Sequence, residues 1–119
     1  MKRVLIVDDE PKICRLLKGF FELRGYHARA TTSGHDALTA VDTQPPDFVL
    51  LDIRMPDMSG LDVLRYLKSS RPEIAVIMVT AVEDRETAET AMALGAMDYI
   101  VKPFSFDEPA WARAFFSDL

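Results

Sequence analysis

Five side chains that could take part in chemistry stand directly after apolar runs of this chain: Asp8, Asp9, Asp52, Thr80 and Lys102. The preceding runs, such as Arg3–Val7 and Phe48–Leu51, are rich in Val, Ile and Leu and are typical of buried parallel strands. Parallel strands present their carboxyl ends at one edge of a sheet, where open α/β folds bind ligands. We therefore expect one crevice that holds three carboxylates, a hydroxyl and an ammonium group.

Carboxylates placed this close together repel one another and need a compensating positive charge. Mg²⁺ would supply it, because this ion prefers oxygen ligands and commonly binds one or two carboxylates together with a phosphate oxygen. The expected strand ends carry no His or Cys, which argues against zinc or copper. Taken singly, the same side chains also fit structural roles: the first two aspartates as helix caps, Thr80 bonded within its own loop and Lys102 in solvent.

The apolar runs alternate with helical patterns along the whole chain. The expected strands are Arg3–Val7, Tyr26–Ala30, Phe48–Leu51, Ala75–Val79 and Ala96–Val101. The signals for helix starts are Pro11, the capping boxes Ser33–Asp36, Ser59–Asp62 and Ser105–Glu108, and a stretch from about Asp84 to Leu94 that Gly95 closes. Five strands that alternate with five helices predict an α/β fold whose parallel sheet is covered on both faces through right-handed crossovers.

Each helix should bury one apolar side against this sheet. The residues expected to face inward are Ile13, Leu16, Leu17, Phe20, Phe21, Ala37, Leu38, Val41, Leu61, Leu64, Leu67, Ala88, Ala91 and Met92. The fourth helix contributes mostly small side chains, so we expect it to shift at little cost. In the last helix, periodicity places Trp111 and Phe115 on one side and Phe116 and Leu119 on another, and we expect only one of the two sides to pack on the sheet.

Composition limits the classes of protein to consider. Residues 1–119 suffice for one domain with its own core. The net charge is −5, and without a basic stripe to neutralise phosphates we expect no nucleic-acid binding by this domain. No apolar run could span a bilayer, and acids interrupt the N-terminal one, so we expect neither a membrane segment nor a signal peptide. The single cysteine, Cys14, excludes an internal disulfide and suits the cytoplasm.

The chain resembles the receiver domain of two-component response regulators. The matching motifs are Asp8-Asp9, the stretch Leu50–Asp62, Thr80-Ala81 and Lys102-Pro103-Phe104. They occur in the family's order and span nearly the whole chain. The resemblance implies a flavodoxin-like, doubly wound sheet with the strand order 2-1-3-4-5. It also implies a signalling phosphoacceptor rather than an enzyme, one that promotes its own phosphorylation and slow autodephosphorylation.

Site roles follow from the same resemblance. Asp52 would take a phosphoryl group from a phosphohistidine, in keeping with the known chemistry of aspartyl phosphates. Mg²⁺ would be held by Asp9, the Asp52 carboxylate and the backbone carbonyl of Arg54, with Asp8 acting through water. Lys102 would contact one phosphoryl oxygen as a compact point charge.

A conformational switch is also implied by the resemblance. Thr80 would move toward the phosphoryl group, and Tyr99 would rotate into the space that Thr80 leaves. A half-buried strand aromatic with its hydroxyl in water explains Tyr99 equally well. The family leads us to expect a cis peptide before Pro103, although sequence alone favours trans.

The implied partner is a sensor histidine kinase or a histidine phosphotransfer protein. Lys12, Arg15 and Lys18 recur on one side of the first helix, which in the family meets the histidine-bearing helix of the partner. A solvated basic face explains these three residues as well. The family reads out phosphorylation through the face made of the fourth helix, fifth strand and fifth helix, so a homodimer through this face is also expected. The aromatic residues of the last helix would contribute to that interface unless they all belong to the core.

Three rival interpretations use the same residues. A flavodoxin-like cofactor binder needs a Ser/Thr/Gly-rich phosphate loop after the first strand, where this chain has Asp-Asp-Glu-Pro. A haloacid-dehalogenase-type phosphatase needs a second Asp two residues after the first, and those positions hold Glu10 and Arg54. A degenerate receiver that serves only as an interaction module is disfavoured by the intact set of acids, hydroxyl and lysine.

The last helix departs from the family pattern. Pro109 and Arg113 stand where family members usually carry branched aliphatic residues, and a helix that starts at the Ser105–Glu108 box would place Pro109 fourth. Two larger organisations are compatible with the sequence: a stand-alone receiver, or one domain of a longer regulator with a DNA-binding or enzymatic output domain.

Overall fold

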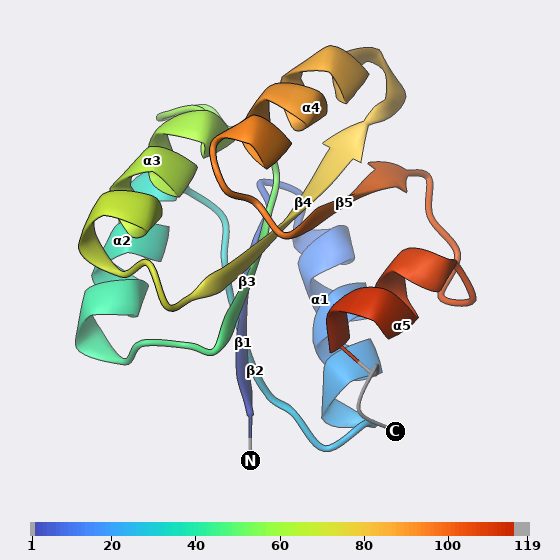
Figure 1. The fold of residues 1–119 in the computed structure, drawn as a ribbon. Coiled ribbons are helices and arrows are strands. Elements are labelled where there is room, and N and C mark those ends of the chain that lie inside the picture. The colour runs from blue at the N-terminus through green and yellow to red at the C-terminus, as the bar shows by residue number, and fades with distance from the viewer. Residues whose placement is uncertain (1, 116–119) are drawn as a thin grey trace.

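Five parallel strands form one open sheet in the computed structural model, which describes residues 2–115 (Figure 1). The strands are β1 (Arg3–Val7), β2 (His27–Thr31), β3 (Phe48–Leu51), β4 (Ala75–Ala81) and β5 (Asp98–Lys102). Their spatial order is β2-β1-β3-β4-β5, which confirms the predicted order. β4 continues two residues past the predicted end because its ladder with β5 runs on through the pairs Thr80–Val101 and Ala81–Lys102.

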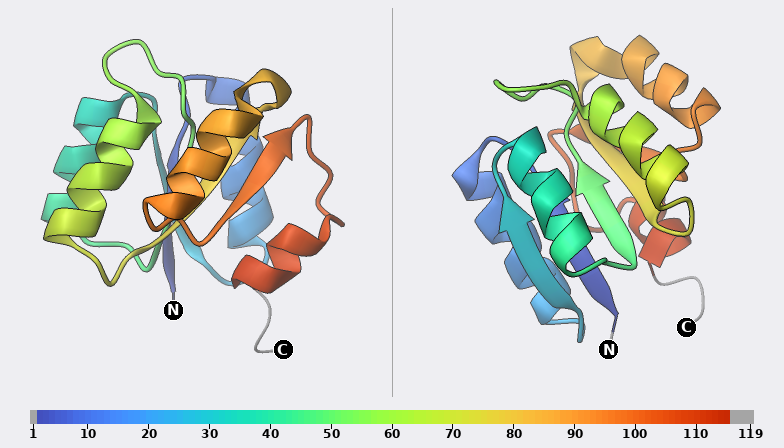
Figure 2. Two further views of the ribbon diagram at one scale, coloured as in Figure 1. Left: turned by 45° about the horizontal axis from the view of Figure 1, so that its top comes forward. Right: turned by 90° about the vertical axis from the view of Figure 1, so that its left-hand side faces the viewer.

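Helices cover both faces of the sheet. They are α1 (Pro11–Glu22), α2 (Gly34–Thr43), α3 (Gly60–Ser70), α4 (Arg85–Ala93) and α5 (Pro109–Phe115), with a 3₁₀ turn, η1 (Val82–Asp84), before α4. α1 and α5 pack on one face, while α2, α3 and α4 pack on the other (Figures 1 and 2). None of the helices in the described part of the chain is long and apolar enough to cross a membrane.

Side chains of the central strands alternate between two cores, as the period of a strand requires. Ile6, Leu50 and Ile77 lie in one row and face α1 and α5. That core is dominated by an aromatic layer, made up of Phe20, Phe21, Tyr26, Phe48, Phe104, Phe106, Trp111 and Phe115. The opposite core, under α2, α3 and α4, is aliphatic and includes Val41, Leu64, Leu67, Met78, Ala88 and Ala91. Packing differs sharply between the two faces.

Two helices begin at the predicted serine caps. The Ser33 hydroxyl accepts a hydrogen bond from the Asp36 N–H at 3.1 Å, and the Ser59 hydroxyl accepts one from the Leu61 N–H at 3.1 Å. Each bond satisfies a backbone donor that has no partner within the helix. The helix starts predicted here are therefore confirmed.

The predicted start of the last helix is wrong. The backbone N–H of Ser105 donates to Glu108 at 3.2 Å, yet the segment between them forms a turn, and α5 starts at Pro109. Proline suits this first position because its missing N–H would have had no helical partner. In this register Pro109 and Arg113 are exposed, whereas Trp111 and Phe115 are buried in the aromatic layer. Phe116 and Leu119 lie outside the described residues.

Two residues predicted to face inward are instead exposed. Leu16 is 50% exposed and Met92 is 38% exposed. Each stands next to a fully packed residue, Leu17 or Ala91, and consecutive residues of a helix point about 100° apart. Periodicity alone placed the edge of each buried stripe one residue too far. The expected cis peptide between Lys102 and Pro103 is present.

Candidate functional site

Lys102 connects three acids at the carboxyl ends of β1 and β3. Its Nζ lies 2.8 Å from Asp8 Oδ2, 3.4 Å from Asp52 Oδ2 and 3.5 Å from Glu10 Oε1. Asp8 is only 2% exposed and Asp52 only 7%. The two carboxylates are therefore held in a nearly dry environment, with the ammonium group as their main counter-charge.

Backbone contacts fix the position of Asp52. Its N–H donates to the Val7 carbonyl at 2.9 Å, which extends the β1–β3 ladder by one bond. On the other side, a Cβ at Gly60 would lie only 2.0 Å from the Asp52 carbonyl oxygen, so no residue with a side chain fits there without movement. The Gly60 N–H also donates to the Ile53 carbonyl at 2.7 Å. The start of α3 thus packs directly on the backbone of Asp52.

Burial governs the charge state of these groups. It raises the pKa of Asp52 to about 6; the neighbouring charge of Asp8 adds to the rise, and Lys102 opposes it. Burial also raises the pKa of Asp8, against the opposing hydrogen bond and charge of Lys102. For Lys102, burial acts to lower the pKa, but the surrounding carboxylates outweigh it and the net change is upward. At neutral pH the site therefore combines a cation with carboxylates that are costly to keep ionised.

The acidic residues fit a hard cation. One oxygen each from Asp8, Asp9 and Glu10 lies within 4.8 Å of the others. Asp8 Oδ2 is buried and has the Lys102 ammonium group 2.8 Å away as its counter-charge. Oxygen-only donors of this kind suit Mg²⁺, which also retains bound waters. Glu10 was missed from the sequence, although it directly follows the two predicted aspartates.

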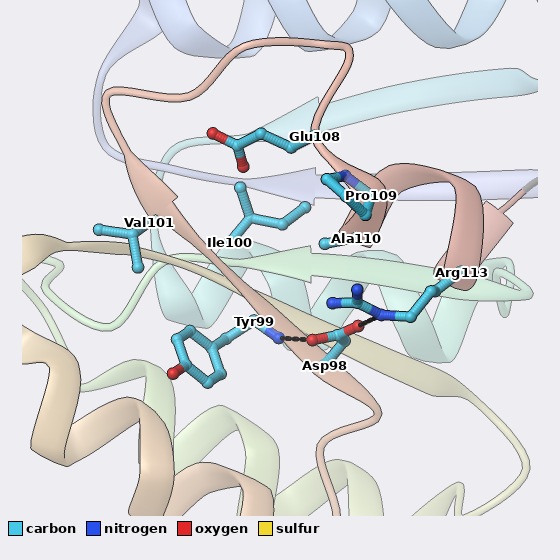
Figure 3. Close-up of a pocket in the computed structure, with 8 residues that line it drawn as sticks. All are labelled: Asp98, Tyr99, Ile100, Val101, Glu108, Pro109, Ala110 and Arg113. Carbon is cyan, nitrogen blue, oxygen red and sulfur yellow. Dashed lines mark hydrogen bonds and ion pairs between the residues drawn. The ribbon is translucent and has the colours of Figure 1, made fainter.

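Thr80 and Tyr99 lie on the α4 side of the sheet. Thr80 is completely buried, and its hydroxyl is 3.4 Å from the Ala81 carbonyl, a long hydrogen bond. Tyr99 pairs with Met78 in the β4–β5 ladder and packs, half-buried, against the aliphatic core. Its ring points away from the Asp98–Arg113 pair (Figure 3). The two residues of the predicted switch therefore share one face of the sheet.

An ion pair beside the site was not predicted. Arg54 donates to Asp84 Oδ1 from Nε at 3.0 Å and from Nη2 at 2.7 Å. The sequence drew attention only to the backbone carbonyl of Arg54. Asp84 could have been noticed as an acid at the start of a helix and four residues after Thr80, but nothing in the sequence pairs it with Arg54.

Comparison with known proteins identifies the family. The family model described as "Response regulator receiver domain" matches residues 4–110. The chain belongs to the response regulator receiver family. The solved receiver domain of NtrX from Brucella abortus superimposes on this receiver with a TM-score of 0.86 at 34% identity, covering 92% of this chain and 93% of that one.

Curated relatives of this receiver are longer proteins. Regulatory protein AtoC of Escherichia coli is 42% identical over 108 residues, and transcriptional regulatory protein KdpE of Mycobacterium tuberculosis is 43% identical over 110 residues. Each match covers 91% of this chain, but only 23% of AtoC and 47% of KdpE. The receiver thus spans about a quarter of one relative and about half of the other. Membership places it among the signalling phosphoacceptors of two-component systems.

Proposed function

We propose that Asp52 accepts a phosphoryl group from the phosphohistidine of a sensor kinase or a histidine phosphotransfer protein. The observation that carries the proposal is the Asp52 carboxylate at the end of β3, ionised above its pKa of about 6 and 3.4 Å from Lys102. One carboxylate oxygen attacks phosphorus, the P–N bond to the histidine breaks, and its electron pair stays on the imidazole nitrogen. Lys102 stabilises negative charge on the transferring oxygens.

Mg²⁺ would be bound by Asp9, the Asp52 carboxylate and the backbone carbonyl of Arg54, with Asp8 acting through water. When bound, it would supply positive charge to the phosphoryl oxygens. The clustering of Asp8, Asp9 and Glu10, each with an oxygen within 4.8 Å of the others, supports this assignment.

The histidine-bearing partner would dock on α1, next to the acceptor. A groove of about 410 Å³ opens beside Lys102 and is lined by Glu10, Ile13, Leu16, Lys102, Pro103 and Phe104. Lys12 and Arg15 are exposed on the same helix, whereas Lys18 pairs with Glu22 at 3.7 Å. The apolar part of this lining, with exposed Lys12 and Arg15 on the same helix, suits an amphipathic helix with acidic residues.

Readout would use the face formed by α4, β5 and α5. Thr80 and Tyr99 would change position there on phosphorylation, and two receivers would associate through this face. A groove of about 400 Å³ lies between β5 and α5, where Arg113 Nε is 3.1 Å from Asp98 Oδ2 (Figure 3). Trp111 and Phe115 are core residues, so the apolar part of the contact would come from α4, which exposes Met92.

Phosphorylation can be tested directly. Acetyl phosphate with Mg²⁺ should add one phosphoryl group, seen by intact-mass spectrometry, and EDTA should prevent it. Asp52→Asn should abolish the addition because an amide is not a nucleophile, and Asp62→Asn, an exposed acid on α3, should leave it unchanged. Full labelling of Asp52→Asn would overturn the assignment. An unmodified wild type that still binds a partner would favour the interaction-module alternative.

A further inference from the structure

The Arg54–Asp84 ion pair joins the two loops on either side of the acceptor. Arg54 follows β3 and lies two residues after Asp52, whereas Asp84 ends the η1 turn that follows β4. Both the Nε and the Nη2 of Arg54 bond to the same oxygen of Asp84, at 3.0 and 2.7 Å. The pair therefore connects the acceptor loop to the N-cap residue of α4.

Asp84 depends on this contact. Asp84 is only 7% exposed, while the Arg54 side chain is 68% exposed. Burying a carboxylate is costly unless it is paired, so removal of Arg54 would leave an uncompensated buried charge. Among the described residues, Arg54 is the one whose side chain bonds to Asp84. The pair is therefore more than an exposed surface ion pair of small effect.

The Asp84 carboxylate bonds to Arg54 and does not cap α4. Asp84 occupies the N-cap position, and aspartate is one of the preferred residues there. Nevertheless its side chain makes no capping hydrogen bond, in contrast to Ser33 before α2 and Ser59 before α3. The first amides of α4 consequently lack the side-chain partner that α2 and α3 have.

A phosphoryl group on Asp52 would compete for Arg54. It would bring a charge of about −1.5 to −2 and three acceptor oxygens, against a single negative charge on Asp84. The planar fork of an arginine matches phosphate oxygens well. Arg54 already lies within electrostatic reach of Asp52, whose charge contributes to raising the Arg54 pKa after the larger effects of Asp84 and Glu83.

We propose that Arg54 exchanges partners: it holds Asp84 in the unphosphorylated receiver, and it turns to the phosphoryl group once Asp52 carries one. The exchange rests on the proposed function. Asp84 is then free to cap α4, so the first turn of α4 changes its hydrogen bonding when the acceptor changes its charge. Arg54 and Asp84 act as positioning residues that couple the site to α4.

A double-mutant cycle followed by hydrogen exchange tests this exchange. Amide exchange of residues 85–88 is measured in wild type, Arg54→Gln, Asp84→Ala and the double variant, each with and without beryllofluoride and Mg²⁺ as the phosphoryl analogue. Without beryllofluoride, Arg54→Gln should slow exchange about fivefold, because it frees Asp84 to cap α4, and it should have no such effect in the double variant, which lacks the capping carboxylate. With beryllofluoride, the two effects should become independent.

Two results would overturn the proposal. Independent effects without beryllofluoride would show that the pair does not control the capping of α4, and equal coupling in both states would show a static contact that phosphorylation does not release. Arg113→Gln is the matched control, because it breaks the Arg113–Asp98 pair away from the acceptor and should leave residues 85–88 unchanged. Phosphoryl uptake by intact mass is measured separately on wild type. Its absence would overturn the proposed function and the exchange, yet coupling without beryllofluoride would still identify the contact with Asp84.

Discussion

Aromatic rings fill the space between the sheet and helices α1 and α5, whereas charged side chains occupy the carboxyl-end edge of the same sheet. In the aromatic layer, Phe20 stacks on Phe106 with ring centroids 4.0 Å apart, and Phe21 meets Phe115 edge-on at 4.7 Å. The buried Trp111 also donates from Nε1 to the Ser105 carbonyl at 3.0 Å. In this layer, both apolar and polar groups are satisfied.

At the charged edge, in contrast, burial is unfavourable. Asp8 and Asp52 are buried at a cost that raises the pKa of each, and both rely on Lys102 as their counter-charge. Stabilising and destabilising groups are thus separated in space: the layer under α5 contributes to the free energy of folding, and the buried carboxylates of the edge reduce it. Substitutions in the two regions should therefore change stability in opposite directions.

The largest effect should come from the aromatic layer. Trp111→Ala removes a side chain that is 1% exposed and leaves a large cavity, so the free energy of unfolding should fall by about 3–5 kcal/mol. Urea unfolding followed by circular dichroism measures the change. Leu23→Ala is the control: Leu23 is 87% exposed, and its loss should change stability by no more than about 0.5 kcal/mol. Similar small losses of stability in both variants would show that the aromatic layer does not dominate the free energy of folding.

At the charged edge, Asp52→Asn should stabilise the protein in the absence of divalent cations. The pKa of Asp52 rises from 3.8 to about 6 on folding, so the folded state binds more protons than the unfolded state between these values. Ionised Asp52 therefore destabilises the wild type increasingly from pH 4 to pH 6, by about 3 kcal/mol above that range. The gain from the substitution should be absent near pH 4 and complete by pH 7. Urea unfolding of both proteins across this pH range measures the gain. A gain that does not change with pH would show that ionisation of Asp52 is not its cause.

The fold could be predicted largely because strands and helices depend on local patterns. Apolar runs such as Phe48–Leu51 and caps such as Ser33 carry their information within a few residues. The clustering of Asp8, Asp52 and Lys102 followed from strand ends meeting at one edge. In contrast, the Arg54–Asp84 pair joins residues 30 positions apart through side chains, and no local pattern reports it. The exposure of Leu16 likewise depends on where the buried stripe of α1 ends, which helical spacing alone does not determine.

Mg²⁺ should partly reverse the cost at the charged edge. An ion present at ten times its Kd for the folded state stabilises that state by about 1.4 kcal/mol, which for a domain of this size corresponds to a rise in Tm of roughly 6 °C. Asp9→Asn should weaken the rise at a given concentration, because it removes a proposed ligand. Differential scanning calorimetry with Mg²⁺, compared with a metal-free sample in EDTA, measures the rise in Tm. An equal rise in both proteins would remove Asp9 from the set of ligands.

The smallest effect should be the response of the aromatic layer to phosphorylation. Trp111 is the single tryptophan and is buried, so its emission should be blue and should stay unchanged with beryllofluoride. Sedimentation velocity on the same samples should show association through the α4–β5–α5 face. A large shift in Trp111 emission would mean that the layer takes part in signalling, and a monomer in both states would rule out the proposed dimer.

Gly60 determines which helix is tied to the backbone of Asp52. A side chain at this position would collide with the Asp52 carbonyl, because the start of α3 packs directly against the Asp52 backbone. The two segments should therefore move together. Displacing the acceptor would carry the whole helix with it and open the packing of Val63, Leu64 and Leu67. α3 would therefore stay in place, and the proposed phosphorylation of Asp52 would instead move the other side of the crevice, where α4 begins.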